Sequence, residues 1–295
     1  REWLEKAIPR KDVSLALPIK WKAINVGELK SYSFERTKEW LLNPQMTWLK
    51  ENEIQSKEFV NLIEDNDLLE LSELERYKLL KYRLENSDLR KINNIKNNSN
   101  YWEENYSGKG VFPPKSSGLI EEDILEERWN NLISAIYATG EITKRNIEMK
   151  ELEGQFYFSG KNLIQIEIGS LKYKTIMNGW LNHLYLSANS SFNSKTLIIS
   201  KKVDYSKKIY YSVSKEILPI KTQDASERLR EIHLLAATGR KNCWPIPPES
   251  GLAYALAINE KNKNEQDLFK KKWEGDLYRQ GERETLAMEL CFGKK

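Results

Sequence analysis

The sequence has 295 residues, 40% of them hydrophobic, which is enough to bury a sizeable core. Its 47 basic and 43 acidic side chains leave a net charge of +4, and this near balance singles out no class of partner. No run of eighteen apolar residues and no signal-peptide pattern occurs, so we expect a cytoplasmic chain that does not enter a membrane.

The N-terminal third of the sequence predicts short helices. Ser33 can cap a helix that must end near Asn43, because the residue before Pro44 avoids the helical region. A second short helix is expected directly afterwards. Ser72 can cap the next helix, which carries apolar residues at roughly helical spacing as far as Leu84.

Between residues 86 and 117 the chain is rich in asparagine, glycine and proline, which predicts a long loop or linker. Trp102 lies in this stretch, where it can serve as an anchor for a partner or as a core residue. The strongest predicted helix follows and ends at Gly140, with an apolar stripe of Ile124, Leu125, Trp129, Leu132, Ile133, Ile136 and Tyr137. We expect residues 1–116 to form a helical extension with a polar linker, and residues 117–295 to form the main domain.

The hydrophobic pattern then changes from helical spacing to the alternation typical of strands. The predicted strands are 152–158, 163–168, 196–200 and 209–213, and the predicted helices are 176–188, 225–237, one after Pro248, and 266–273. Strands interspersed with helices in this order predict an α/β core with helical additions.

Several common catalytic motifs are absent from the sequence. It contains no Gly-x-Gly-x-x-Gly, Walker A or Gly-x-Ser-x-Gly pattern, so nothing predicts a nucleotide cofactor or a serine nucleophile. Cys243 and Cys291 form no Cys-x-x-Cys pair, and His183 and His233 have no metal-binding spacing. We expect no cofactor and no metal, and thiols that stay reduced as in cytosolic proteins.

One segment resembles the core of the PD-(D/E)xK nuclease superfamily as RecB-like enzymes carry it. It includes Leu152–Phe158, a turn, Leu163–Gly169 and the helical stretch Trp180–Ala188. In that superfamily an aspartate and a second carboxylate on paired strands hold a divalent metal, a lysine helps to activate water, and the next helix carries Gln-x-x-x-Tyr. The resemblance implies a restriction-endonuclease-like mixed sheet flanked by helices, preceded here by the helical extension.

The catalytic residues of that superfamily are mostly missing at the matching positions. The metal-binding aspartate falls on Tyr157, the lysine on Gly169 and the helix glutamine on Leu181. Only the second carboxylate, at Glu167, and the helix tyrosine, at Tyr185, are kept. One carboxylate alone gives a hard cation too few oxygen ligands, so the resemblance implies a scaffold without catalytic residues.

A divergent metal nuclease remains the alternative, with Glu153, Glu167 and either Lys172 or Lys174 as its catalytic residues. Phosphodiester cleavage needs positive charge on the developing oxyanions, which a metal and a lysine would provide. The two glutamates meet only in some registers of the two strands, so their geometry distinguishes the alternatives.

Further segments resemble the C-terminal part of the RecC family, the gamma chain of exodeoxyribonuclease V. Asn43 departs from this pattern, because a histidine is expected there. The segments occur in order between about residues 33 and 285 and are Phe34–Pro44, Asp67–Tyr77, Trp180–Ala188, Pro247–Gly251 and Trp273–Asp276.

The RecC resemblance implies a non-catalytic structural and DNA-path domain of a RecBCD-type helicase–nuclease that acts in double-strand break repair and recombination. The implied partners are RecB-like and RecD-like subunits, which supply the motors and the nuclease, and forked or single-stranded DNA. A general DNA-binding module unrelated to RecC remains a further possibility.

Basic residues are concentrated in the second half of the chain. Residues 1–150 carry 24 basic and 26 acidic side chains, whereas residues 151–295 carry 23 and 17. The turn between the last two predicted strands combines lysines with a tyrosine, which favours backbone contact and base stacking, and we predict DNA binding by Lys201, Lys202, Tyr205, Lys207 and Lys208. Solvated lysines that protect a sheet edge explain the same pattern and are the more common case.

Overall fold

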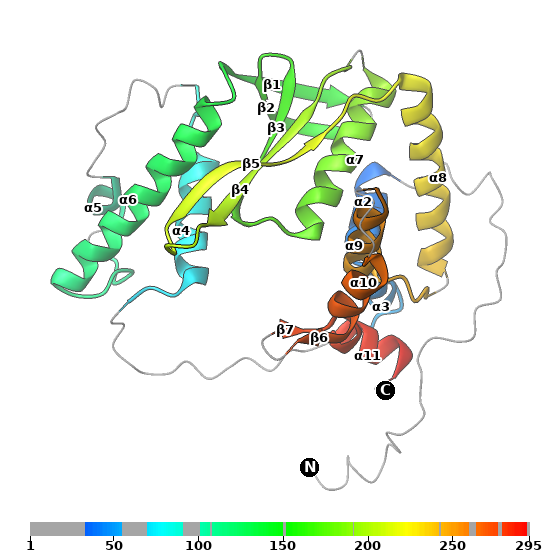
Figure 1. Ribbon diagram of the computed structural model, residues 1–295. Coiled ribbons are helices and arrows are strands. Elements are labelled where there is room, and N and C mark those ends of the chain that lie inside the picture. The colour runs from blue at the N-terminus through cyan, green and yellow to red at the C-terminus, as the bar shows by residue number, and fades with distance from the viewer. Residues whose placement is uncertain are drawn as a thin grey trace, which may run out of the picture. The chain divides into compact units, whose positions relative to one another are not determined.

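The computed structural model describes residues 33–54, 70–90, 101–106, 108–149, 152–190, 192–241, 243–259, 264–276 and 279–293 (Figure 1). These residues fall into two compact units. The sheet unit takes its residues from 60–183 and 190–220, and the helical unit takes its residues from 1–59, 184–189 and 221–295. The division expected at residue 116 remains a prediction, because compactness does not test which segments fold independently.

The sheet unit contains five strands in the order β1-β2-β3-β4-β5 (Figure 1). Its elements are α4 (Glu73–Asn86), α5 (Tyr101–Tyr106), α6 (Ser116–Tyr137), β1 (Ile142–Met149), β2 (Leu152–Ser159), β3 (Asn162–Ser170), α7 (Tyr173–Asn189), β4 (Thr196–Val203) and β5 (Ile209–Ile217). The last part of α7, residues 184–189, belongs to the helical unit. Only β3 and β4 are parallel, and α7 connects them, since parallel neighbours need a crossover. The mixed sheet flanked by helices, with the strands of Leu152 and Leu163 adjacent, confirms the predicted fold class.

The core of the sheet unit lies between α6 and one face of the sheet. Leu125, Leu132 and Ile136 of α6 are fully buried and pack in one cluster with Ile164 and Ile199 of the sheet. Each such side chain stabilises the fold by about 1.5–3 kcal/mol when removed from water. The apolar stripe predicted for this helix is therefore its buried face.

β1 was not predicted from the sequence. Lys144, Arg145 and Asn146 interrupt the apolar alternation that marks a strand, because both faces of this segment carry polar side chains. The strand nevertheless pairs with β2 along all eight of its residues. The sheet therefore has one more strand, at its edge, than the sequence pattern indicated.

The linker predicted before residue 117 is wrong for the part that forms α5. This short helix buries Trp102 to 1% exposure, and the indole Nε1 donates a hydrogen bond to a carboxylate oxygen of Glu126 at 3.0 Å. The guanidinium of Arg83 lies 4.2, 4.9 and 4.4 Å from the ring centres of Tyr101, Trp102 and Trp129. Trp102 is therefore a core residue of the sheet unit.

The helical unit contains α2 (Phe34–Leu42), α3 (Pro44–Glu51), α8 (Thr222–Lys241), α9 (Pro248–Asn259), α10 (Glu265–Glu274) and α11 (Leu286–Phe292), with a hairpin of β6 (Gly275–Asp276) and β7 (Arg279–Gln280). As predicted, Ser33 caps α2 by accepting from the Arg36 amide, and α2 ends before Pro44. α2 packs closely on α8, because Gly239 has no Cβ, which would lie 2.0 Å from Cζ2 of Trp40. The hairpin and α11 were not predicted.

Candidate nuclease-like site and basic hairpin

Glu167 lies near the end of β3, where the β3–β4 register shifts between Glu167 and Ser170. The Gly169 amide donates a hydrogen bond to its Oε1 at 2.9 Å, and the Thr175 hydroxyl donates to its Oε2 at 2.7 Å. Both carboxylate oxygens therefore have partners within the chain. The side chain joins the end of β3 to the first turn of α7.

The position that resembles the catalytic lysine has little free space around it. A Cβ built on Gly169 would lie 3.2 Å from Oε1 of Glu167 and 3.6 Å from Cε2 of Tyr77, a residue of α4. Burial raises the pKa of Tyr77, and the Glu167 carboxylate raises it further. A neutral tyrosine thus lies close to the place where the superfamily has a cationic side chain.

Tyr157 and Glu167 point to opposite faces of the sheet. Tyr157 pairs with Ile164, and side chains three residues apart on a strand, such as Ile164 and Glu167, lie on opposite faces. The contacts agree, since the Tyr157 hydroxyl donates to the carbonyl of Ser87 after α4, whereas Glu167 binds Thr175 of α7. A carboxylate at position 157 would therefore not share a metal ion with Glu167.

The alternative catalytic set is not brought together by the described contacts. Glu153 pairs with Glu148 in the β1–β2 ladder, but its side chain lies outside the described part of the structure. Lys172 and Lys174 are exposed, and the ammonium of Lys174 lies 5.8 Å from the ring centre of its neighbour Tyr173. Among the described residues, no group of three or more His, Cys, Asp or Glu side chains is arranged to hold a metal ion.

The two helix positions of the superfamily pattern are packing residues. Leu181 is fully buried. Tyr185 is 4% exposed, and its ring centre lies 4.4 Å from that of Phe34 within the helical unit. The tyrosine that the resemblance retained is thus a core side chain in this chain.

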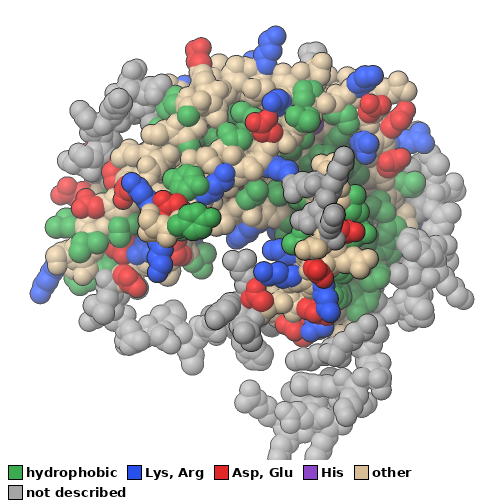
Figure 2. Space-filling model, in the orientation of Figure 1, with side chains coloured by type: hydrophobic (Ala, Val, Ile, Leu, Met, Phe, Trp, Pro, Cys, Tyr) green, Lys and Arg blue, Asp and Glu red, His purple; other side chains and the backbone are tan. Residues whose placement is uncertain are grey.

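The turn between β4 and β5 presents the predicted DNA-binding residues. Asp204 fixes the turn by accepting bonds from the Ser206 hydroxyl at 2.6 Å and the Lys208 amide at 2.9 Å, which together lower its pKa. Tyr205, Lys207 and Lys208 are exposed at the tip. Figure 2 shows basic, acidic and hydrophobic side chains beside one another over this hairpin.

Lys201 differs from the other lysines of the hairpin because it is bound in an ion-pair network. Its ammonium lies 3.0 Å from Oε2 of Glu73, whose carboxylate also pairs with Arg128 at 2.7 Å and Arg76 at 3.0 Å. Hydrogen bonds from Arg128, Lys201 and Arg76 hold the pKa of Glu73 at about 2. Lys201 therefore fixes the base of the hairpin to α4 and α6.

A protein-family comparison identifies the chain. The family model described as the RecC C-terminal domain matches residues 30–259, which is more than three quarters of the sequence and runs from α2 to the end of α9. The chain belongs to the RecC C-terminal domain family. No curated protein matches the sequence.

Membership in the RecC C-terminal domain family indicates a subunit of a RecBCD-type complex in DNA repair. The match covers the segments around Phe34, Trp180 and Pro247 that carried the resemblance, whereas the segment beginning at Trp273 lies beyond it. No described helix is both long and apolar enough to cross a bilayer.

The sequence did not predict which residues of this RecC domain contact Glu167 at the end of β3 and Lys201 in the β4–β5 hairpin. Tyr77 and Glu73 lie far in sequence from β3 and the hairpin, so no local motif signals their contacts there. Thr175 follows Glu167 by eight residues, in the next element, but no motif marks the hydrogen bond between them. The capping box of Ser72 and Glu75 was the local signal near Glu73, and it predicts only the start of α4.

Proposed function

We propose that this RecC C-terminal domain is a non-catalytic structural part of a RecBCD-type helicase–nuclease in the cytoplasm. The observation that supports the proposal is the hydrogen bonding of Glu167, whose two carboxylate oxygens accept from the Gly169 amide and the Thr175 hydroxyl. The position expected for its metal-binding partner holds Tyr157 on the opposite face. Metal-assisted cleavage of a phosphodiester needs several oxygen ligands at one point, and these positions do not supply them.

The proposed partners are RecB-like and RecD-like subunits and forked or single-stranded DNA. The DNA contact is assigned to the β4–β5 hairpin, where Tyr205, Lys207 and Lys208 are exposed and Lys202 is half-buried. Lys201 acts from behind the hairpin, because its ion pair with Glu73 fixes the hairpin base. The exposed lysines would neutralise phosphates, and the tyrosine would stack on a base.

The test combines assembly with cleavage. The full chain is co-expressed with RecB-like and RecD-like subunits from the same source, and labelled forked DNA is added with Mg²⁺ or Mn²⁺. We expect a stable complex that cleaves DNA, no cleavage by the chain alone, and no loss of cleavage when the complex carries Glu167→Gln. Cleavage by the chain alone that Glu167→Gln abolishes would instead support the divergent nuclease that uses Glu153, Glu167 and Lys172 or Lys174.

A further inference from the structure

β1 presents a continuous row of backbone groups at an edge of the sheet. It pairs with β2 without a register shift, and no described strand lies on its other side. The Gly160 amide donates to the Glu141 carbonyl at 3.2 Å, so this pair is a hydrogen-bonded one. Since such pairs alternate along an antiparallel ladder, the backbone groups of Lys144 and Asn146 point away from β2. No described strand pairs with these groups, so they can pair with a further strand.

The opposite edge of the sheet is more protected. Asn131 of α6 donates its side-chain amide to the carbonyl of Ile209 at the start of β5, at 3.3 Å. A long, regular edge strand is a template for pairing with another chain unless something covers it. In the described part of the sheet unit, β1 is the less covered edge, and its Lys144 and Arg145 restrict pairing to a strand of complementary charge.

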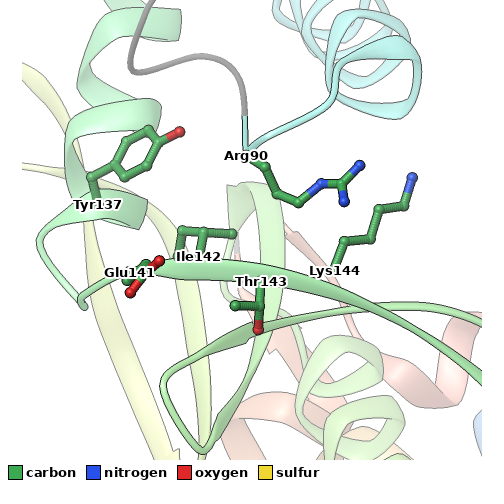
Figure 3. Close-up of a pocket in the computed structure, with 6 residues that line it drawn as sticks. All are labelled: Arg90, Tyr137, Glu141, Ile142, Thr143 and Lys144. Carbon is green, nitrogen blue, oxygen red and sulfur yellow. The ribbon is translucent and has the colours of Figure 1, made fainter.

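A pocket of about 540 Å³ opens beside the first residues of β1 and is lined by Arg90, Tyr137, Glu141, Ile142, Thr143 and Lys144. Figure 3 shows the side chains of Arg90 and Lys144 extending in the same direction from two neighbouring segments. Asp88 accepts from Nε and Nη2 of Arg90 at 2.9 and 2.6 Å, which leaves Nη1 for another acceptor. The pocket thus holds a guanidinium and an ammonium, together with the Glu141 carboxylate. Asp88 already pairs with Arg90, so Lys144 is the pocket cation that has no ion pair with a described residue.

The charge of β1 also favours an acidic partner. Lys144 and Arg145 lie on opposite faces of the strand, 5.8 Å from the ring centre of Tyr157 and 4.6 Å from that of Phe158. Neither cation forms an ion pair with any described residue. A nucleic-acid phosphate would satisfy their charge and could accept from an outward N–H, but it has no donor for the outward carbonyls of Lys144 and Asn146. A protein strand satisfies both features.

We propose that an extended, acidic segment of a partner subunit adds to β1 as a sixth strand and places a carboxylate between Arg90 and Lys144. The inference rests on the proposed function, since the partner is a subunit of the RecBCD-type complex. Main-chain hydrogen bonds would supply the affinity of such strand addition, and the pocket would supply its specificity.

Asn146→Pro tests the strand pairing directly. Proline removes the outward amide of Asn146 but no bond to β2, and proline is tolerated where the missing N–H faces solvent at an edge. With the co-expressed RecB-like and RecD-like subunits, we expect Asn146→Pro to weaken assembly by about tenfold, as the removal of a backbone hydrogen bond and the added ring predict. The matched control Asn146→Ala keeps the amide and should assemble as the parent does.

Lys144→Glu tests the charge and also covers the case in which Asn146→Pro fails to fold. Lys144→Glu should weaken assembly by about tenfold or more. Hydrogen exchange of the 142–149 amides should be slower in the assembled parent than in the free chain, and Lys144→Glu should remove this slowing. If the parent assembles and both variants assemble equally well, this inference is wrong and the proposed function stands. If the parent chain does not assemble with the two subunits, the inference and the proposed function are both wrong. If Lys144→Glu weakens only forked-DNA binding, the edge is a DNA contact and the inference is overturned.

Discussion

The end of β3 and the β4–β5 turn are both polar regions of the sheet unit, but their polar groups are engaged differently. At the end of β3, Glu167 binds Gly169 and Thr175, so its acceptors are satisfied within the chain. At the turn, Lys207 and Lys208 extend into solvent with their charges exposed. A partly buried group with its hydrogen bonds satisfied is costly to disrupt, whereas an exposed cation remains free to meet a polyanion. A charged residue in a suggestive motif therefore has to be judged by its partners.

The largest expected effect comes from the network behind the hairpin. Glu121 is 3% exposed and pairs with Arg76 at 2.6 Å. Glu121→Ala leaves the half-buried cation with Glu73 as its remaining carboxylate partner in this network, so we expect a loss of about 3 kcal/mol in the free energy of unfolding. Urea unfolding followed by circular dichroism measures it. The exposed neighbour Glu127→Ala is the control and should change stability by less than about 0.5 kcal/mol. Equal midpoints for the two variants would show that the network does not stabilise the fold.

The second prediction concerns the closed end of β3. Glu167→Ala leaves the Gly169 amide and the Thr175 hydroxyl without their acceptor, so we expect a loss of about 1–3 kcal/mol in the free energy of unfolding. Adding Mn²⁺ should leave the melting temperature of the parent and of the variant unchanged. A stabilisation of the parent by Mn²⁺ that Glu167→Ala removes would mean that this carboxylate is a metal ligand.

The third prediction is a pH dependence located at Glu73. Its pKa is lowered from 4.5 to about 2 in the folded chain, first by the hydrogen bond from Arg128. The folded state therefore binds the proton less readily, and the resulting stability is present above about pH 4.5 and lost as the pH falls towards 2. Because the side chain is 53% exposed, solvent screening limits the effect to about 1 kcal/mol. Glu73→Gln should flatten this acid limb in urea unfolding at a series of pH values, and an unchanged limb would contradict the assignment.

The sequence predicted those parts of the fold that local signals determine. The capping residues Ser33 and Ser72 marked helix starts, and the turn at Gly160, where φ is +57°, joined two strands. β1 was missed because an edge strand needs few apolar residues, so its pattern is weak. The candidate site was predicted only in part, because the opposite faces of Tyr157 and Glu167 depend on strand register, which the motif does not encode.

The smallest effect on stability should come from the lysines of the β4–β5 turn. Removing them should change DNA binding instead. Each lysine–phosphate interaction that is removed reduces the salt slope of binding by about 0.7–0.9, so Lys202→Ala, Lys207→Ala and Lys208→Ala together should flatten it by about two units. The melting temperature should stay nearly unchanged, because Lys207 and Lys208 are exposed and the half-buried Lys202 forms no ion pair with a described residue. Binding of the full chain to labelled single-stranded or forked DNA across a salt series measures the slope.

Lys201→Ala is the matched control, since this lysine pairs with Glu73 and is only 18% exposed. It should lower the free energy of unfolding by up to about 0.5 kcal/mol and leave the salt slope close to that of the parent. If the triple variant binds DNA like the parent at every salt concentration, the hairpin is not the DNA contact, and its lysines serve only to solvate the turn. If the triple variant unfolds more readily instead, the lysine stems cover apolar surface, and the distinction between the anchored lysine and the exposed ones is wrong.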